Sequence, residues 1–362
     1  MMVIAYQSSE FFSKICLVSL CSLIENNLNE DDIYVYILSK DFSYESLENV
    51  KGLLKKFGFN RDNVEIINIS NLKDRIDLTF DDYEGKWGID SFCKLLLGKL
   101  LPSSVKRVLY LDSDTVVCEN LHDFYHMNLD NYAVAAVKDF ISKEYYDYFG
   151  LTDEEDVYCN SGVMLFNLDN WRRMGIEQSI SNYLKEKKGF VFFSEQTVLN
   201  VVCRKRIKVV DLKYNLTSVP SCLTKKQIYY LRKPYNSYSD KEIEYARNNP
   251  AIIHFTSIFL VYGRAWILNN NHVLSNYFNR YSMDVPQFSP VIATKKSKFI
   301  YMIIHIVPKN LMCFFAGLYY KKVRLTKYEK YKKRVLKKWL GVVYMIDTFT
   351  SVIYIVFFCF VY

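Results

Sequence analysis

Short apolar runs alternate with longer amphipathic segments in the first part of the chain. The apolar runs 2–6, 33–38 and 64–67 predict strands, whereas the amphipathic segments 12–26 and 43–57 predict helices. Such an alternation is typical of a parallel sheet with covering helices. We therefore predict an α/β fold for the first part of the chain.

Two acidic residues follow the next apolar run, 108–111. The run ends in Asp112, Ser113 and Asp114. In sheets of this kind, ligands bind beyond the carboxyl ends of the strands. If the chain stays extended, Asp112 and Asp114 point to the same side and can share one hard divalent cation with a diphosphate. The simpler alternative is an Asx turn after a strand, and the motif alone leaves both open.

Three further stretches follow in order along the chain. Residues 158–168 contain a polar turn that leads into an apolar run, residues 195–200 read Glu-Gln-Thr-Val-Leu-Asn, and residues 252–257 contain an apolar run that ends at His254. Together with the Asp-Ser-Asp motif, they resemble glycosyltransferase family 8 over about residues 2–282. The resemblance implies a GT-A-type fold with a Rossmann-like, mostly parallel sheet, and retaining transfer from a sugar nucleotide.

The resemblance also implies a metal site and a donor site. Asp112, Asp114 and His254 would hold Mn²⁺ or Mg²⁺ between the two phosphates of a UDP-sugar, where the ion neutralises the leaving group. A lone histidine at the end of an apolar strand can equally be a core residue. The implied donor-binding residues are Ala5, Tyr6, Gln7, Ser9, Lys94, Asp139, Asn160, Ser161, Gly162 and Arg264.

Glu195 and Gln196 are the implied catalytic residues. Glu195 would contact the sugar hydroxyls, and Gln196 would lie beneath the anomeric carbon. A neutral amide is a weak nucleophile, so Gln196 favours a displacement in which the acceptor hydroxyl attacks the face that the diphosphate leaves. A covalent intermediate on Glu195 is the competing mechanism.

Positive charge is concentrated near the end of the chain. Residues 295–338 contain fourteen Lys or Arg and one Glu, whereas residues 1–294 carry a net charge of −4 out of the overall +8. Two apolar stretches, 299–304 and 311–320, predict short interfacial segments. We therefore predict a catalytic domain at residues 1–283 and a basic, apolar, helical membrane-associating tail at residues 284–362.

The last segment, 341–362, is apolar except for Asp347. As a helix it would be about 33 Å long, enough to cross a hydrocarbon core of about 30 Å. It could span the membrane, lie in the interface or pack against the protein. In the first two cases, residues 295–362 would meet an anionic membrane surface, and we expect no nucleic-acid partner.

The nine cysteines lie mostly in apolar runs and form no Cys-x-x-Cys pair, so neither a disulfide framework nor a zinc site is predicted.

The chain opens on a strand rather than a secretory leader. We expect the protein at the cytoplasmic face of the membrane, held peripherally or by a single C-terminal segment.

The predicted function is metal-dependent, retaining transfer of a hexose from a UDP-sugar to a lipid-linked or cell-surface glycan, as in lipopolysaccharide or capsular polysaccharide synthesis. A nucleotidyltransferase also uses paired acids after a strand, but the chain lacks a Gly-rich basic nucleotide motif near its start. Ser9, Phe11, Lys94 and Thr197 depart from the common family pattern. They leave open a catalytically inactive, membrane-bound protein that binds a nucleotide sugar or a glycan.

Overall fold

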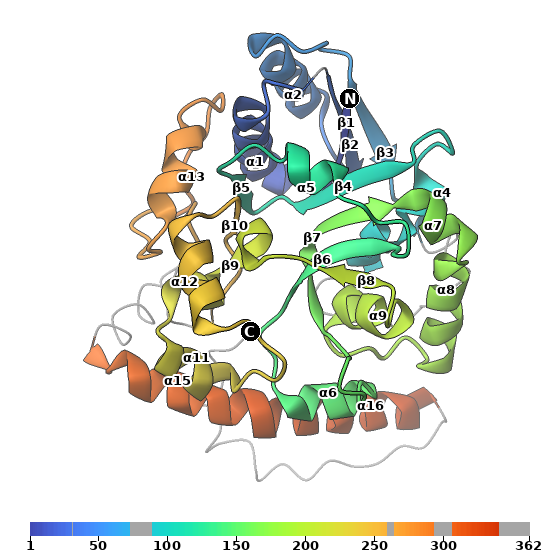
Figure 1. Ribbon diagram of the computed structural model, residues 1–362, viewed down its shortest axis with the longest axis vertical. Helices are drawn as coiled ribbons and strands as arrows, with labels where there is room; N and C mark the ends of the chain where they lie inside the picture. Colours follow the sequence, from blue (N-terminus) through green and yellow to red (C-terminus); the bar gives the residue numbers. More distant parts are fainter. Residues whose placement is uncertain (31, 73–88, 259–263, 293–305, 340–362) are drawn as a thin grey trace.

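A twisted sheet forms the centre of the computed structural model, which describes residues 1–30, 32–72, 89–258, 264–292 and 306–339 (Figure 1). Across this sheet the strand order is β3-β2-β1-β4-β7-β6-β8. Strand β7 runs antiparallel to both of its neighbours, and the remaining pairs are parallel. The predicted α/β fold with a mostly parallel sheet is therefore confirmed. The strands are β1 Met2–Gln7, β2 Ile33–Ser39, β3 Val64–Asn68, β4 Arg107–Asp112, β6 Val134–Lys138, β7 Cys159–Asn167 and β8 Ile207–Val209.

Helices cover both faces of this sheet because successive strand residues point to opposite faces. In β1, Ile4 and Tyr6 belong to the core beneath α1 (Ser13–Asn26) and α2 (Tyr44–Lys56). Ala5 belongs to the core on the other face. That second core is closed by η2 Ile89–Leu96, α4 Leu97–Leu100, α7 Leu168–Arg173, α8 Ile176–Glu186 and α9 Ser194–Val202.

A small second sheet adjoins the carboxyl end of β4. Its central strand, β10 (Ile252–His254), pairs antiparallel with β5 (Thr115–Val117) and parallel with β9 (Leu216–Thr217). Only Ser113 and Asp114 separate β4 from β5, so the chain passes from one sheet to the other within a tight turn. The acidic motif therefore lies where the two sheets meet.

Shorter helices connect these strands. Two of them, α11 and α12, begin with capping boxes in which Thr224 and Gln227, and Ser239 and Glu242, bond each other's backbone. Among the described residues before 283, the other helices are η1 Glu10–Phe12, α5 His122–His126, α6 Lys143–Phe149, η3 Leu212–Asn215, α10 Ser218–Cys222, α11 Lys225–Arg232, α12 Asp240–Asn248 and α13 Ser275–Ser282.

The segment 139–156 is partly helical and well packed. Tyr145 and Tyr146 on α6 are fully buried in an aromatic cluster. In the same segment, both Asp156 carboxylate oxygens accept 2.5 Å hydrogen bonds from Arg204. A solvated loop is therefore excluded for the tyrosines of α6.

The C-terminal helices lie along one edge of the molecule, beside α11 and α6 (Figure 1). They are α15 Lys309–Leu318, the π-helical turn η4 Tyr319–Val323 and α16 Arg324–Trp339. Gly317 makes the approach to α11 possible, because a β-carbon there would lie 1.9 Å from the Tyr230 carbonyl oxygen. Tyr320 joins the aromatic cluster of α6, and the Tyr145 hydroxyl donates a 2.5 Å hydrogen bond to its carbonyl.

Part of the predicted membrane-associating tail thus packs on the rest of the protein. No helix among the described residues is both long and apolar enough to cross a membrane. The predicted interfacial stretch 299–304 and the predicted segment 341–362 lie outside the described residues.

Candidate functional site

Asp112, Asp114 and His254 converge where the two sheets meet. One ligand atom from each lies within 4.8 Å of the others. His254 Nε2 lies 3.0 Å from Asp114 Oδ1 and 3.8 Å from Asp112 Oδ2. The His254 side chain is buried, whereas those of Asp112 and Asp114 are 28% and 18% exposed. Two carboxylates and one imidazole thus face a common point that solvent can reach.

Backbone pairing brings these three residues together from distant parts of the sequence. His254 pairs with Thr115 across the small sheet, and the Phe255 amide donates to the Asp114 carbonyl over 2.9 Å. The premise of an extended Asp112–Asp114 segment is wrong, because residues 113 and 114 form a turn. The Thr115 hydroxyl donates to the Asp112 carbonyl over 2.9 Å and supports this turn. The turn, rather than strand alternation, directs both carboxylates toward His254.

The orientation of His254 is fixed by Asn215. His254 Nδ1 lies 3.0 Å from Asn215 Oδ1, and Asn215 Nδ2 donates to Asn160 Oδ1 over 2.9 Å. An amide oxygen can only accept, so Nδ1 carries a proton and Nε2 faces the two acids. This is the arrangement in which a histidine acts as a metal ligand with a fixed tautomer.

Arg264 pairs with one of the acids. Its guanidinium contacts Asp114 Oδ2 and also the carbonyl oxygen of Phe255. Burial alone would raise the pKa of Asp114, but the charges of His254 and Arg264 outweigh it and lower that pKa. Asp114 is therefore held as a carboxylate. Arg264 thus lies beside the acidic motif, and its predicted contact with the donor diphosphate stays a prediction.

Lys94 connects the acidic motif with the predicted catalytic pair. Its buried ammonium lies 2.7 Å from Asp112 Oδ1 and 3.7 Å from Glu195 Oε1, and it donates to the Ser161 carbonyl. Burial alone would lower the pKa of Lys94, but the carboxylates of Asp112 and Glu195 raise it. Tyr110 also donates to Asp112 Oδ1, over 2.8 Å. Lys94 is therefore a buried cation that offsets the negative charge of both acids.

The start of β7 brings the predicted sugar-binding residues beside Gln196. Gln196 Oε1 accepts hydrogen bonds from Asn160 Nδ2 and the Ser161 amide, at 3.2 and 3.3 Å. Gln196 Nε2 donates to Asp139 Oδ2 over 2.9 Å. Both ends of the Gln196 amide are thus held, and the side chain has one defined orientation.

Glu195 is nearly buried beside this group. Its Oε1 accepts a 3.3 Å hydrogen bond from the Ser161 hydroxyl. Its Oε2 is buried and has no hydrogen-bond partner among the described residues. Such an oxygen carries a desolvation cost that a donor from a bound ligand would offset.

Gly162 permits the close approach of β7 to His254 and Asp112. A β-carbon at this position would lie 2.1 Å from His254 Cε1 and 2.8 Å from Asp112 Oδ2. No side chain fits there without moving one of the two ligands. Gly162 therefore leaves room for His254 and Asp112, and its predicted contact with the donor stays a prediction.

The amino-terminal residues predicted to bind the donor differ in their accessibility. Ala5 and Tyr6 are fully buried, and the Tyr6 hydroxyl lies 3.2 Å from the Ser19 hydroxyl in the core. The backbone of Gln7 reaches the site, since its carbonyl accepts a 2.7 Å hydrogen bond from Ser113. Ser9 is half-buried at the start of η1. The side chains of Ala5 and Tyr6 therefore belong to the core, whereas Gln7 contacts the acidic turn through its backbone.

Sequence reasoning missed Asn215 and Tyr110. Asn215 lies in the short η3 helix, and Tyr110 points from β4 beneath Asp112. Neither belongs to a recognisable motif, and their roles depend on contacts between segments far apart in the sequence. No sequence signal could have identified Asn215.

Comparisons with known proteins identify the family of this chain. The sequence profile of glycosyl transferase family 8 matches residues 3–259. The chain therefore belongs to glycosyltransferase family 8, and we describe it as a glycosyltransferase. This excludes the nucleotidyltransferase alternative and favours an enzyme over the binding protein left open by the sequence.

Among similar proteins is general stress protein A of Bacillus subtilis, 29% identical over 154 residues, which are 42% of this chain and 51% of that protein. Glycosyltransferase GlyA of Streptococcus pneumoniae is 25% identical over 225 residues, which are 62% of this chain and 27% of that protein. The chain thus spans about half or less of the length of these two relatives. The galactosyltransferase LgtC, solved with donor and acceptor sugar analogues, shares the fold with a TM-score of 0.62 at 18% identity, over 83% of this chain and all of LgtC.

Proposed function

We propose that this glycosyltransferase moves a hexose from a UDP-sugar, in a metal-dependent reaction with retention of anomeric configuration. The observation that carries the proposal is the convergence of Asp112, Asp114 and His254, with ligand atoms within 4.8 Å of one another. Gln196 and Glu195 are linked to this group through Asn160, Ser161 and Lys94. Metal ligands and sugar-binding groups are therefore adjacent, as transfer from a sugar diphosphate requires.

The three candidate ligands suit a divalent cation. His254 Nε2 faces two carboxylates at 3.0 and 3.8 Å, so either a proton on this nitrogen or a cation must lie between them. Two oxygen ligands and one imidazole fit Mn²⁺, and Mg²⁺ is the alternative. A bound cation would neutralise charge that develops on the departing diphosphate. Arg264, already paired with Asp114, can add a second positive charge there.

The held orientation of Gln196 supports a displacement on one face of the sugar. Its amide oxygen accepts two hydrogen bonds, and its amide nitrogen donates to Asp139. A neutral amide in this state positions a substrate rather than attacking it. Glu195 is the rival nucleophile, but Lys94 and Ser161 already engage one of its oxygens. The other oxygen, Oε2, is free to accept a sugar hydroxyl once a donor binds.

A lipid-linked or cell-surface glycan, as in lipopolysaccharide or capsular polysaccharide synthesis, is the proposed acceptor, because the C-terminal helices suit a membrane surface. Helix α15 exposes Leu311, Phe314 and Phe315, and Ile306 just before it is exposed as well. The segment 321–338, which includes most of α16, carries ten Lys or Arg. Exposed apolar side chains beside a cationic segment favour an anionic bilayer surface. We therefore place the enzyme at the cytoplasmic face of a membrane.

A screen of UDP-sugars tests the proposal. Purified protein with Mn²⁺ should hydrolyse one UDP-hexose slowly without acceptor, and chelation of the metal should stop the reaction. Anomeric configuration of the transferred sugar, measured by nuclear magnetic resonance, should match that of the donor. Metal-independent turnover or inversion would contradict the proposal.

A further inference from the structure

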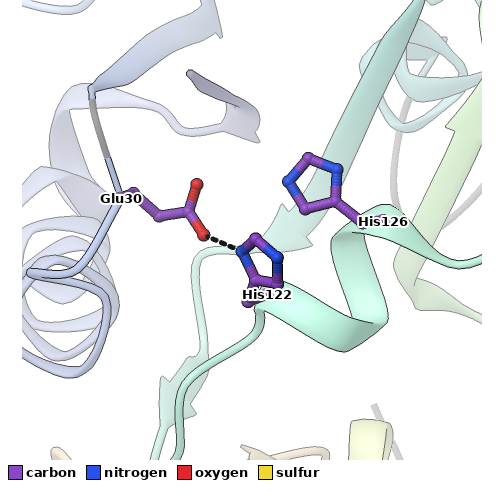
Figure 2. A group of neighbouring side chains, drawn as sticks. All are labelled: Glu30, His122 and His126. Atoms are coloured by element: carbon purple, nitrogen blue, oxygen red, sulfur yellow. Dashed lines mark hydrogen bonds and ion pairs between the residues drawn. The ribbon is translucent and has the colours of Figure 1, made fainter.

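A second group of metal-ligating side chains lies away from the candidate active site. Glu30 follows α1, and His122 and His126 are the first and last residues of α5 (Figure 2). One ligand atom from each of these three side chains lies within 4.8 Å of the others. His122 Nδ1 lies 2.8 Å from Glu30 Oε1, and the two imidazole rings are 4.4 Å apart between centroids. We call these three residues the Glu30–His126 cluster.

The chemistry of this cluster is that of a zinc site. Histidines four residues apart on a helix lie on one face and can bind the same ion. Figure 2 shows both imidazole rings on the same side of α5. The Glu30 side chain is only 5% exposed, and its carboxylate is bonded to His122. A buried carboxylate is costly unless it is paired, and a cation shared with two imidazoles would pair it fully.

The backbone around the cluster is fixed on both sides. Buried Asn27, in the turn that contains Glu30, accepts a 2.7 Å hydrogen bond from the Leu121 amide at the start of α5. Arg107 donates to the carbonyls of Tyr125 and Met127 at the other end of this helix, over 2.6 and 2.7 Å. The turn after α1 and helix α5 are thus locked together, and the three side chains need only small rotations to share an ion.

Another group of potential metal ligands differs from the Glu30–His126 cluster in how its carboxylates are paired. Cys21, Glu25 and Asp284 also place three potential ligand atoms close together. There, however, Arg280 pairs with Glu25 and Lys56 pairs with Asp284. These cations already neutralise the carboxylates. In the Glu30–His126 cluster, the partner of the carboxylate is itself a potential ligand.

We propose that the Glu30–His126 cluster binds Zn²⁺ and fastens the turn after α1 to α5. Two imidazole nitrogens and one carboxylate oxygen are ligands that Zn²⁺ prefers. Both histidines are exposed, so water can complete the coordination. Because the ion binds only the folded arrangement of these two segments, it stabilises the native state by mass action. The inference is independent of the proposed transfer reaction.

The test uses the full-length protein and Zn²⁺ alone as the probe. Zinc binding is measured by calorimetry, and melting temperature is measured with and without zinc. To separate the two sites, both measurements are made in an Asp114→Asn background, with and without His126→Ala. The background protein should bind one zinc at the cluster and melt at a higher temperature with zinc, whereas the added His126→Ala should weaken binding roughly tenfold or more and reduce the thermal shift accordingly.

The matched control is Asp123→Asn, which changes an exposed residue of the same helix that is not part of the cluster. It should bind zinc like the background protein. His126 is exposed, so its replacement leaves the core intact, and the melting temperature without zinc verifies folding. Equal zinc affinity and equal thermal shifts with and without His126→Ala would overturn the proposal.

Discussion

His254 Nδ1 lies 3.0 Å from Asn215 Oδ1, and this contact begins a directional chain of hydrogen bonds through the site. Asn215 donates to Asn160, Asn160 donates to Gln196, and Gln196 donates to Asp139. Every donor in the chain points toward the Asp139 carboxylate. The candidate metal ligand and the candidate catalytic glutamine are therefore oriented by one network.

This network predicts that Asn215 controls metal affinity without touching the metal. Asn215→Leu removes the acceptor for His254 Nδ1, so the imidazole loses its fixed tautomer. Removing such an outer partner weakens metal binding by about 10- to 100-fold. Mn²⁺ affinity, measured by calorimetry or by the Mn²⁺ dependence of UDP-sugar hydrolysis, should fall by this factor.

Asn215→Asp is the matched control, because it keeps an oxygen for His254 Nδ1 while it loses the donor to Asn160. It should retain most of the Mn²⁺ affinity and lose activity through the disturbed Asn160 and Gln196. Equal Mn²⁺ affinity in wild type and Asn215→Leu would show that the contact does not orient His254.

Gly162→Ala should disable the candidate metal site by steric conflict alone. The new methyl group would lie 2.1 Å from His254 Cε1 and 2.8 Å from Asp112 Oδ2, so a ligand must move. Mn²⁺-dependent hydrolysis should fall by roughly 100-fold or more, as expected for misplaced catalytic groups. Gly52→Ala, on α2 with no atom within 4 Å of the new methyl group, should keep full activity. Unchanged Mn²⁺ affinity in Gly162→Ala would be evidence against the close approach of β7.

Gln196→Ala should slow transfer while leaving donor binding largely intact. The loss should be about 10- to 1,000-fold, or ~1.4 to 4 kcal/mol of transition-state stabilisation. Turnover and UDP-sugar affinity are measured separately. A covalent sugar on Glu195, detected by mass spectrometry during turnover, would instead support double displacement.

The C-terminal helices should bind anionic vesicles through both apolar and cationic groups. Leu311→Ser combined with Phe315→Ser should weaken binding to vesicles that contain phosphatidylglycerol, because both side chains are exposed on α15. High salt should weaken binding further, since surface attraction is screened within about 10 Å at 0.1 M. Tyr44→Ser, at an exposed position on α2, is the control. Equal sedimentation of all variants, or no binding at all, would exclude α15 as a membrane contact.

The sequence predicted the first three strands because each is a mostly apolar run that is followed by polar residues. It also singled out Asp112, Asp114 and His254, which the structure brings together. The premise of an extended segment was wrong, however, because a two-residue turn orients the acids. Periodicity cannot reveal that β10 pairs with β5, which places His254 beside Asp114. The same holds for Asn215, whose role exists only through contacts across 39 and 55 positions in the chain.

The C-terminal tail shows a second limit of prediction from sequence. Apolar stretches such as 311–320 read equally well as membrane contacts and as packing surfaces, because both bury apolar area. In the structure, one part of this stretch is buried and another is exposed. Cys313, Ala316 and Tyr320 are buried against the protein, whereas Leu311 and Phe315 are exposed. Only three-dimensional neighbours decide which face of such a helix is free.

Asp114→Asn tests the central claim, a catalytic divalent cation held by Asp112, Asp114 and His254, most directly. The amide keeps the shape of the side chain but removes the charge, so Mn²⁺-dependent turnover of the UDP-sugar should fall below detection while the fold is retained. Asp169→Asn, at an exposed surface ion pair with Lys106, should behave like wild type. Circular dichroism verifies folding of both variants. A wild-type rate for Asp114→Asn at saturating Mn²⁺ would contradict the account.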